Sequence, residues 1–293
     1  MPQGIEPSNL DKPFWPAAGL TKGDLIAYFD AVAPFILPTL RDRPLTVVRF
    51  PDGIDGMRFY QKNTPSYAPS WVKTVTLHAG SAKRDVRYVL CNSKRVLLWL
   101  ANQAAIELHP WLSRADRLER PDLLVFDLDP PEGGFDVAVQ VAGVMREALA
   151  EFGLEASAKT SGSKGVHVCV PLERRHHYRE VRRAADFLAA RVEDEIPDVA
   201  TTKFLKAERG GRLFLDTGRN APGAHVVTVY SPRAREPGSV SFPVTWDELR
   251  TVAPQDFTIT NVPSILQREG DRWSDLLPRP QRLGELLRAG GSS

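Results

Sequence analysis

The clearest hydrophobic pattern lies in the middle of the chain. The run DLLVFDLDP at 122–130 is typical of a strand, and apolar residues at helical spacing predict an amphipathic helix over 136–152. Gly153 suits the position just after such a helix. The pattern then predicts a strand at 156–160, a turn at 161–165, a strand at 166–170 and a helix over 178–196.

The flanking regions add helices and short strands. Thr21 is a good N-cap residue for a helix that we expect to end at Pro38. The runs at 45–50 and 57–62 predict strands on either side of the turn-rich segment PDGIDG. The other expected elements are a hairpin of 73–77 and 87–91, a buried helix over 96–108, strands at 212–216 and 225–231, and a short helix from 245 to 249.

The order of these elements predicts the fold class. Strands and helices mix without strict strand–helix–strand alternation, which favours an α+β fold with mixed, largely antiparallel central sheets flanked by helices. We find no internal repeat and no proline-rich linker between two halves. We therefore expect residues 1–293 to form a single domain, with the segment 1–40 packing on its core.

Composition narrows the class of protein without choosing a function. The hydrophobic share is 42% and the charged share 25%, as in ordinary globular proteins. A net charge of +2 is too small for a general nucleic-acid binder, so any such contact must be a local patch. No membrane span or secretory signal is expected, and Cys91 and Cys169 form no close pair, so a cytoplasmic protein fits best.

The motif FDLDP carries the first candidate chemistry. Alternate residues of a strand share a face, so Asp127 and Asp129 project together with their Cα atoms roughly 6.5–7 Å apart. Two neighbouring carboxylates favour a cation between them, and hard oxygen ligands suit Mg²⁺ or Mn²⁺. Asp216 ends the apolar run RLFLD and completes the set if its strand lies beside 122–129. The alternative is that these aspartates only cap loops.

The segment TSGSKGVH, residues 160–167, carries the second candidate chemistry, which is the binding of an anion. Its glycines allow the backbone to approach an anion, its serines supply hydroxyls and Lys164 supplies a positive charge. By alternation, His167 faces away from the valines at 166, 168 and 170. A plain hairpin turn with a surface histidine is the alternative. Paired acids, a third acid and a basic Ser/Gly loop together suit a metal-bound nucleoside triphosphate.

FDLDP, TSGSKGVH and FLD (214–216) resemble the three motifs of the archaeo-eukaryotic primase superfamily. They resemble most closely the polymerase domain of bacterial ligase D, which acts in non-homologous end joining, and its stand-alone relatives. The likeness runs from LDKPFWP to TWDEL. It implies a primase-polymerase catalytic domain in which Asp127, Asp129 and Asp216 hold two divalent ions, Mn²⁺ or Mg²⁺.

The resemblance also implies binding roles. The residues that would hold the incoming NTP or dNTP are His109, Ser161, Lys164, His167, Arg209 and Arg233. The residues that would contact DNA are Lys12 and Lys22, at a 5′-phosphate, and the aromatic pair Phe59 and Tyr60, on a template base. After Asp216 the sequence reads TGRN, without the tryptophan that ligase D has there.

These features favour a template-directed repair polymerase that prefers ribonucleotides and fills short gaps or extends ends at DNA breaks. Its partners would be DNA with a gap or break carrying a 5′-phosphate, a separate DNA ligase and end-joining or excision-repair proteins, in a bacterial, nucleoid-associated setting. The alternatives are a primase that starts chains de novo, a catalytically silent DNA-end-binding module, and a metal-dependent nuclease or phosphoesterase.

Overall fold

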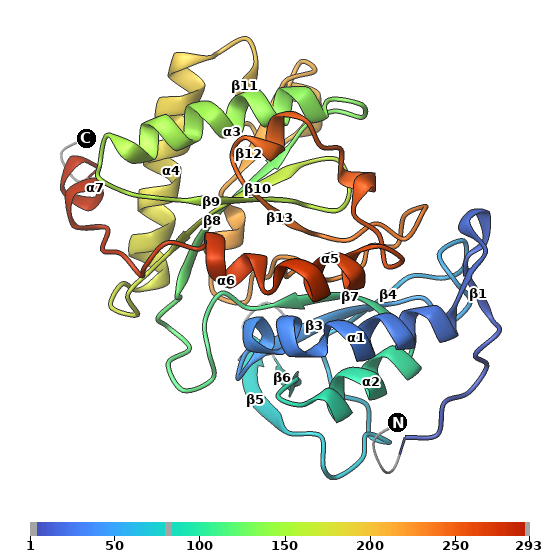
Figure 1. The fold of residues 1–293 in the computed structure, drawn as a ribbon. Helices are drawn as coiled ribbons and strands as arrows, with labels where there is room; N and C mark the ends of the chain where they lie inside the picture. Colours follow the sequence, from blue (N-terminus) through green and yellow to red (C-terminus); the bar gives the residue numbers. More distant parts are fainter. Residues whose placement is uncertain (1–4, 80–83, 291–293) are drawn as a thin grey trace. The chain divides into compact units, whose positions relative to one another are not determined.

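Residues 5–79 and 84–290 are described by a computed structural model, in which the chain divides between two units (Figure 1). Both units draw on segments that are distant in the sequence. Unit 1 comprises Met1–Asp116, His225–Phe242 and Gln255–Asp271, and unit 2 comprises Arg117–Ala224, Pro243–Pro254 and Arg272–Ser293. Each unit has its own sheet and its own helices.

The sheet of unit 1 is antiparallel throughout. Its strands are β3 (Pro44–Arg49), β4 (Phe59–Gln61), β5 (Thr74–Ala79), β6 (Arg84–Leu90) and β7 (Ala105–Pro110), and the short pair β1 (Pro13–Trp15) and β2 (Leu20–Thr21) lies outside it. β3 pairs with β4, β6 and β7. β5 and β6 form the expected hairpin, whose connecting residues 80–83 lie outside the described residues.

The helices of unit 1 are α1 (Lys22–Leu40), α2 (Lys94–Asn102) and α5 (Val262–Glu269). α1 begins as predicted, since Thr21 and Asp24 form a capping box. The expected end at Pro38 was wrong, because α1 passes through Pro34 and Pro38 to Leu40. Burial of one face of the helix, including Leu25, offsets the backbone hydrogen bonds that its prolines cannot make.

α1 is also the one helix, among the described residues, that is long and apolar enough to cross a membrane by length and composition. It contacts α2 and α5 of the same unit. Phe29, Val32 and Ile36 are fully buried in the core. These contacts identify α1 as a core helix of unit 1, because its largest apolar residues on one face are covered by protein.

Two predicted elements of unit 1 were wrong. The apolar run 96–108 is not one helix: α2 ends at Asn102, Ala104 takes a left-handed φ of 62°, and β7 follows. A continuous apolar run does not distinguish buried helix from buried strand, which explains the error. The segment 225–231 is not a strand, since its main chain makes a single bridge from His225 to Trp111 and turns at Tyr230 with φ 62°.

The sheet of unit 2 has the order β11-β12-β8-β10-β9-β13. Its strands are β8 (Leu123–Asp129), β9 (Ser157–Thr160), β10 (Val166–Pro171), β11 (Ala200–Thr201), β12 (Leu213–Asp216) and β13 (Pro243–Val244). Only the β11–β12 pair is parallel. β8 therefore lies between β10 and β12, which places three predicted motifs on neighbouring strands.

The helices of unit 2 are α3 (Phe135–Ala150), α4 (Tyr178–Glu195), α6 (Arg272–Leu276) and α7 (Gly284–Ala289). α3 and α4 both contact β8 and one another, and Leu124, Phe126 and Leu128 are buried. The short 3-10 helices of the chain are η1 (Pro16–Ala18), η2 (Lys206–Glu208), η3 (Gly218–Asn220), η4 (Glu248–Arg250) and η5 (Pro254–Asp256). The predicted α+β class with largely antiparallel sheets is confirmed.

Candidate active site

The predicted acids of unit 2 lie on two neighbouring strands, and His167 on a third strand extends the row. β12 pairs with β8 so that Asp216 lies directly opposite Asp127, and β10 pairs with β8 so that His167 lies opposite Asp127 on the other side. Directly opposed residues project from the same face of a sheet. Asp129 follows two residues along β8 and shares that face.

Arg219, which the sequence did not single out, lies between two of these acids. Its Nε is 3.0 Å from Asp127 Oδ2 and its Nη2 is 3.2 Å from Asp216 Oδ2. On the other side of Asp127, His167 Nε2 lies 3.2 Å from Oδ1. The only sequence signal for Arg219 was its position three residues after Asp216, at the end of a strand.

The two opposed carboxylates differ in their acidity. Burial favours the protonated form of Asp127, but His167 and then Arg219 together hold its pKa well below the usual range. Burial raises the pKa of Asp216, and the charge of Asp127 raises it further, although Arg219 acts in the opposite direction. Asp127 therefore favours the charged form more strongly than Asp216 does.

Asp129 is approached by two other predicted residues. Lys164 Nζ is 3.0 Å from its Oδ1 and donates to the Pro130 carbonyl at 2.7 Å. Arg209 Nη1 is 3.8 Å from its Oδ2, and the Arg209 guanidinium lies over the Phe214 ring at 4.0 Å. Two of the basic side chains predicted for the triphosphate, Lys164 and Arg209, therefore lie beside the carboxylates.

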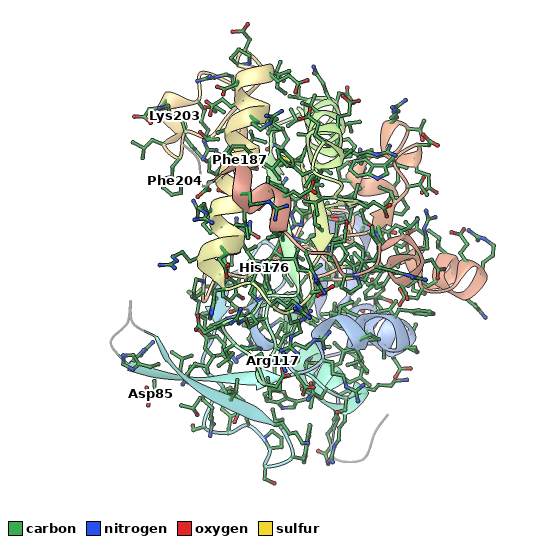
Figure 2. All side chains as sticks on the ribbon, turned by 90° about the vertical axis from the view of Figure 1, so that its left-hand side faces the viewer. Asp85, Arg117, His176, Phe187, Lys203 and Phe204 are labelled. Carbon is green, nitrogen blue, oxygen red and sulfur yellow. The ribbon has the colours of Figure 1, made fainter. Side chains whose placement is uncertain are left out.

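Arg209 is held by the loop that precedes it. Its Nη2 donates to the Phe204 carbonyl at 2.8 Å, and its Nε donates to the Lys203 carbonyl at 3.3 Å. Figure 2 shows Lys203 and Phe204 on this loop beside α4. The Phe204 side chain packs edge-on against Phe214 yet the residue is 75% exposed. The loop is thus joined to Asp129 through one arginine.

The 161–165 turn is closed by its own serine. Ser161 Oγ accepts from the backbone N–H of Ser163 at 3.2 Å and of Gly165 at 3.1 Å. Gly162 has φ 66°, a conformation that favours glycine. Gly165 is buried against β8, and a Cβ built there would lie 2.1 Å from the Leu128 carbonyl oxygen. Because residue 165 is glycine, the turn can approach the β8 backbone closely, and this approach places Lys164 and His167 beside the acids.

The donor set of this site suits a hard divalent cation. Asp127, Asp129 and Asp216 offer carboxylate oxygens on one face of the sheet, and hard divalent cations prefer oxygen ligands. Those oxygens are now paired with Arg219 and Lys164. No three ligating side chains converge on one point within residues 5–79 and 84–290. Binding of a cation therefore requires these basic side chains to give up contacts.

A second group of predicted residues meets in unit 1. Glu107 and His109 lie on β7, and Arg233 lies in the segment after Tyr230. His109 Nε2 is 2.9 Å from Glu107 Oε2, and Arg233 Nε is 3.1 Å from Glu107 Oε1. Glu107 was also missed from the sequence, although its place two residues before His109 puts both on one face of the strand.

The two predicted phosphate-binding lysines are neighbours in unit 1. The N–H of Lys22 donates to the Lys12 carbonyl at 2.9 Å, because β1 and β2 bring these residues together. Lys22 Nζ donates to the Ser8 carbonyl at 2.6 Å, and Lys12 Nζ pairs with Asp52 at 2.6 Å. Burial lowers the pKa of Lys22, and the charges of Lys12 and Arg49 lower it further.

The predicted aromatic pair lies on the edge strand β4. Phe59 is 44% exposed and Tyr60 is 57% exposed, so neither serves as a core residue. Phe59 is opposite Arg49 and Tyr60 is opposite Val48, which places their rings on opposite faces of the strand. The Arg58 guanidinium lies 4.5 Å from the centroid of the Tyr60 ring. Exposed rings beside arginine suit stacking on bases.

The row of acids, the basic turn and the α+β fold define a DNA-directed nucleotidyltransferase of the primase-polymerase class. Residues 21–273 match the family described as LigD, primase-polymerase domain. The chain belongs to that family.

Relatives and a solved structure agree with this assignment. The chain is 34% identical over 278 residues to the bifunctional non-homologous end joining protein LigD of Bacillus subtilis (strain 168), covering 94% of this chain and 44% of that protein. It is 34% identical over 278 residues to the multifunctional non-homologous end joining DNA repair protein LigD of Mycobacterium tuberculosis (strain H37Rv), covering 92% and 36%. The chain thus spans less than half the length of these relatives.

The polymerase domain from Mycobacterium tuberculosis Ligase D, solved in complex with DNA, has a similar structure. The TM-score is 0.86 at 31% sequence identity, covering 94% of this chain and 98% of that domain. The similarity therefore extends over the whole of one domain of the larger protein.

Proposed function

We propose that this protein is a template-directed repair polymerase that fills short gaps or extends ends at DNA breaks and prefers ribonucleotides. The observation that carries the proposal is the His167–Asp127–Asp216 row, with Asp129 and Lys164 beside it. Such acids, together with a basic turn, suit the transfer of a nucleotide from a triphosphate. The name of the similar Mycobacterium domain, a polymerase domain bound to DNA, supports the same reaction.

In this proposal Asp127, Asp129 and Asp216 hold two divalent ions, Mn²⁺ or Mg²⁺. When bound, the ions would neutralise triphosphate charge and favour attack by the primer 3′-hydroxyl. Lys164 and Arg209 flank Asp129 and would bind phosphate oxygens. The proposed nucleotide-binding residues are Ser161, Lys164, His167 and Arg209 of unit 2 and His109 and Arg233 of unit 1.

The proposed DNA contacts belong to unit 1. Lys12 and Lys22 form a local positive patch that suits a 5′-phosphate, since two neighbouring ammonium groups gain from an anion between them. Phe59 and Tyr60 are exposed and suit stacking on an unpaired template base. We place the protein at broken or gapped DNA in the bacterial cytoplasm, where a DNA ligase and end-joining or excision-repair proteins act with it.

Primer extension tests the proposal. A short-gapped duplex with a 5′-phosphate is supplied with Mn²⁺ and either NTPs or dNTPs, and the product is resolved by length. We expect templated extension that an Asp127→Ala, Asp129→Ala protein loses and that Glu147→Gln, which removes an exposed carboxylate on α3, retains. A duplex without the 5′-phosphate tests the lysine patch, and a template without primer tests de novo priming.

The outcomes separate the alternatives. A greater extension rate with NTPs than with dNTPs supports the ribose preference, and equal rates oppose it. DNA binding without extension by folded wild-type protein would point to an end-binding module. Strand cleavage in the absence of nucleotide would point to a nuclease.

A further inference from the structure

We propose that Glu107 is a positioning residue that holds the side chains of His109 and Arg233 in the orientation that binds the incoming nucleotide. This inference rests on the proposed function, because the nucleotide-binding role of His109 and Arg233 is part of it. Glu107 acts through its neighbours and touches no reacting atom. Its role differs from that of the carboxylates of unit 2, which face the proposed cations.

The contacts of Glu107 use both of its carboxylate oxygens. Oε2 lies 2.9 Å from His109 Nε2. Oε1 accepts from Arg233 Nε at 3.1 Å and from the backbone N–H of Ala234 at 3.1 Å. The Glu107 side chain is only 6% exposed, so water does not compete with these donors. One buried carboxylate therefore fixes two side chains that are 124 residues apart in the sequence.

The charge of Glu107 persists despite its burial. Burial alone would raise its pKa, but the Arg233 guanidinium and then the hydrogen bond from His109 keep the pKa well below the usual range. An ionised acceptor makes shorter and stronger hydrogen bonds than a neutral one. His109 must then donate from Nε2, and the plane of the Arg233 guanidinium is set by its Nε–H.

The backbone around these side chains is held by other groups. The N–H of Arg233 donates to the Ser239 carbonyl at 2.7 Å, and its carbonyl accepts from Trp15 Nε1 at 3.1 Å. His109 is opposite Thr46 in the β3–β7 ladder. Loss of the Glu107 charge should therefore release the two side chains while leaving the course of the main chain unchanged.

The decisive variant is Glu107→Gln, which keeps the size of the side chain and removes its charge. With saturating gapped DNA and varied NTP, we expect the KM for NTP to rise about 10- to 100-fold, with a smaller change in kcat. Equilibrium binding of a fluorescent ATP analogue should weaken by a similar factor. Glu119→Gln, at an exposed glutamate, is the matched control and should change neither quantity.

A double-mutant cycle distinguishes positioning from a purely structural role. If Glu107 acts through Arg233 and His109, Glu107→Gln should add little to the KM of the Arg233→Ala, His109→Ala protein. A full additive effect would overturn the inference, and so would an unchanged KM in a Glu107→Gln protein of reduced stability. If the glutamine variant does not fold, Glu107→Asp keeps the charge but shortens the side chain, and the same cycle applies.

Failure of the proposed function gives a different result. If wild-type protein binds the nucleotide analogue but extends no primer, the proposed polymerase function is overturned. The double-mutant cycle, measured by binding of the analogue, would still test the role of Glu107. Extension with a normal KM in Arg233→Ala, His109→Ala would leave the polymerase intact and overturn the inference.

Discussion

Gly165→Ala offers a direct test of how the basic turn and the acids are held together. A Cβ at this position would lie 2.1 Å from the Leu128 carbonyl oxygen, whereas real Cβ atoms essentially never approach closer than 3.0 Å. The atom in the way belongs to the backbone, so no change of side-chain rotamer can relieve the clash. The turn and β8 must therefore separate by about 0.9 Å, unless the β8–β10 ladder is broken.

The expected magnitude follows from that displacement. Overpacking of this kind costs about 1–3 kcal/mol of unfolding free energy. Gly165 also lies between Lys164, which pairs with Asp129, and His167, which pairs with Asp127. A shift near 1 Å in a catalytic constellation lowers the rate by about 100-fold. We therefore expect a modest loss of stability and a much larger loss of primer-extension rate.

The assay compares urea unfolding and kcat for the variant and a matched control. Gly143→Ala is that control, because Gly143 lies within α3 and a Cβ built there meets nothing within 4 Å outside the neighbouring backbone of its own helix. This variant should gain about 0.5–1 kcal/mol of unfolding free energy. Wild-type stability and wild-type rate in Gly165→Ala would refute the reasoning. A loss of stability with an unchanged rate would refute only the link between this contact and the chemistry.

The remaining predictions concern metal binding, DNA binding and pH. Arg219→Gln removes the ion pairs of Arg219 with Asp127 and Asp216, and because the Arg219 side chain is 39% exposed, each pair is worth about 0.5–1 kcal/mol. Mn²⁺ binding measured by calorimetry should therefore tighten roughly 5- to 30-fold. Weaker binding would show that Arg219 assists the cation. Tyr60→Ala should weaken binding of gapped DNA by about 1–3 kcal/mol in a fluorescence anisotropy titration, whereas Tyr67→Ala, at a tyrosine that is 60% exposed, should have less effect. The pKa of Glu107 is lowered in the folded state, so its contribution to stability is present above about pH 4.5 and is lost as the pH falls. Below that pH, the unfolding free energy of Glu107→Gln should decline less steeply than that of the wild type. Parallel curves would contradict the ionised, paired state of Glu107.

The sequence predicted the core of unit 2 well because its signals are local. Strand alternation placed Asp127 and Asp129 on one face and turned His167 away from the valines, and the structure has both. The helices α3 and α4 follow from apolar spacing. The pairing of Asp216 with Asp127 was expected only if their strands were neighbours, since register between distant strands leaves no local mark.

The errors and omissions have a common physical origin in long-range contacts. The strand β7 was taken for the end of a helix because its partner β3 is far away in the sequence. Glu107 and Arg219 were missed because their importance depends on which charges meet them in space. The segment 225–231 is rich in β-branched residues, yet its hydrogen bonds go to scattered partners such as Leu108 and Ser241.

The interleaving of the two units limits how the protein can be divided. Unit 1 consists of the segment Met1–Asp116 and two later segments, His225–Phe242 and Gln255–Asp271. The shortest uninterrupted piece of chain that holds all of unit 1 ends at Asp271, and it also carries most of unit 2. No simple truncation can therefore isolate the half that bears Lys12, Lys22 and Tyr60. A fragment that carries only these proposed DNA contacts would need a circular permutation or a designed splice.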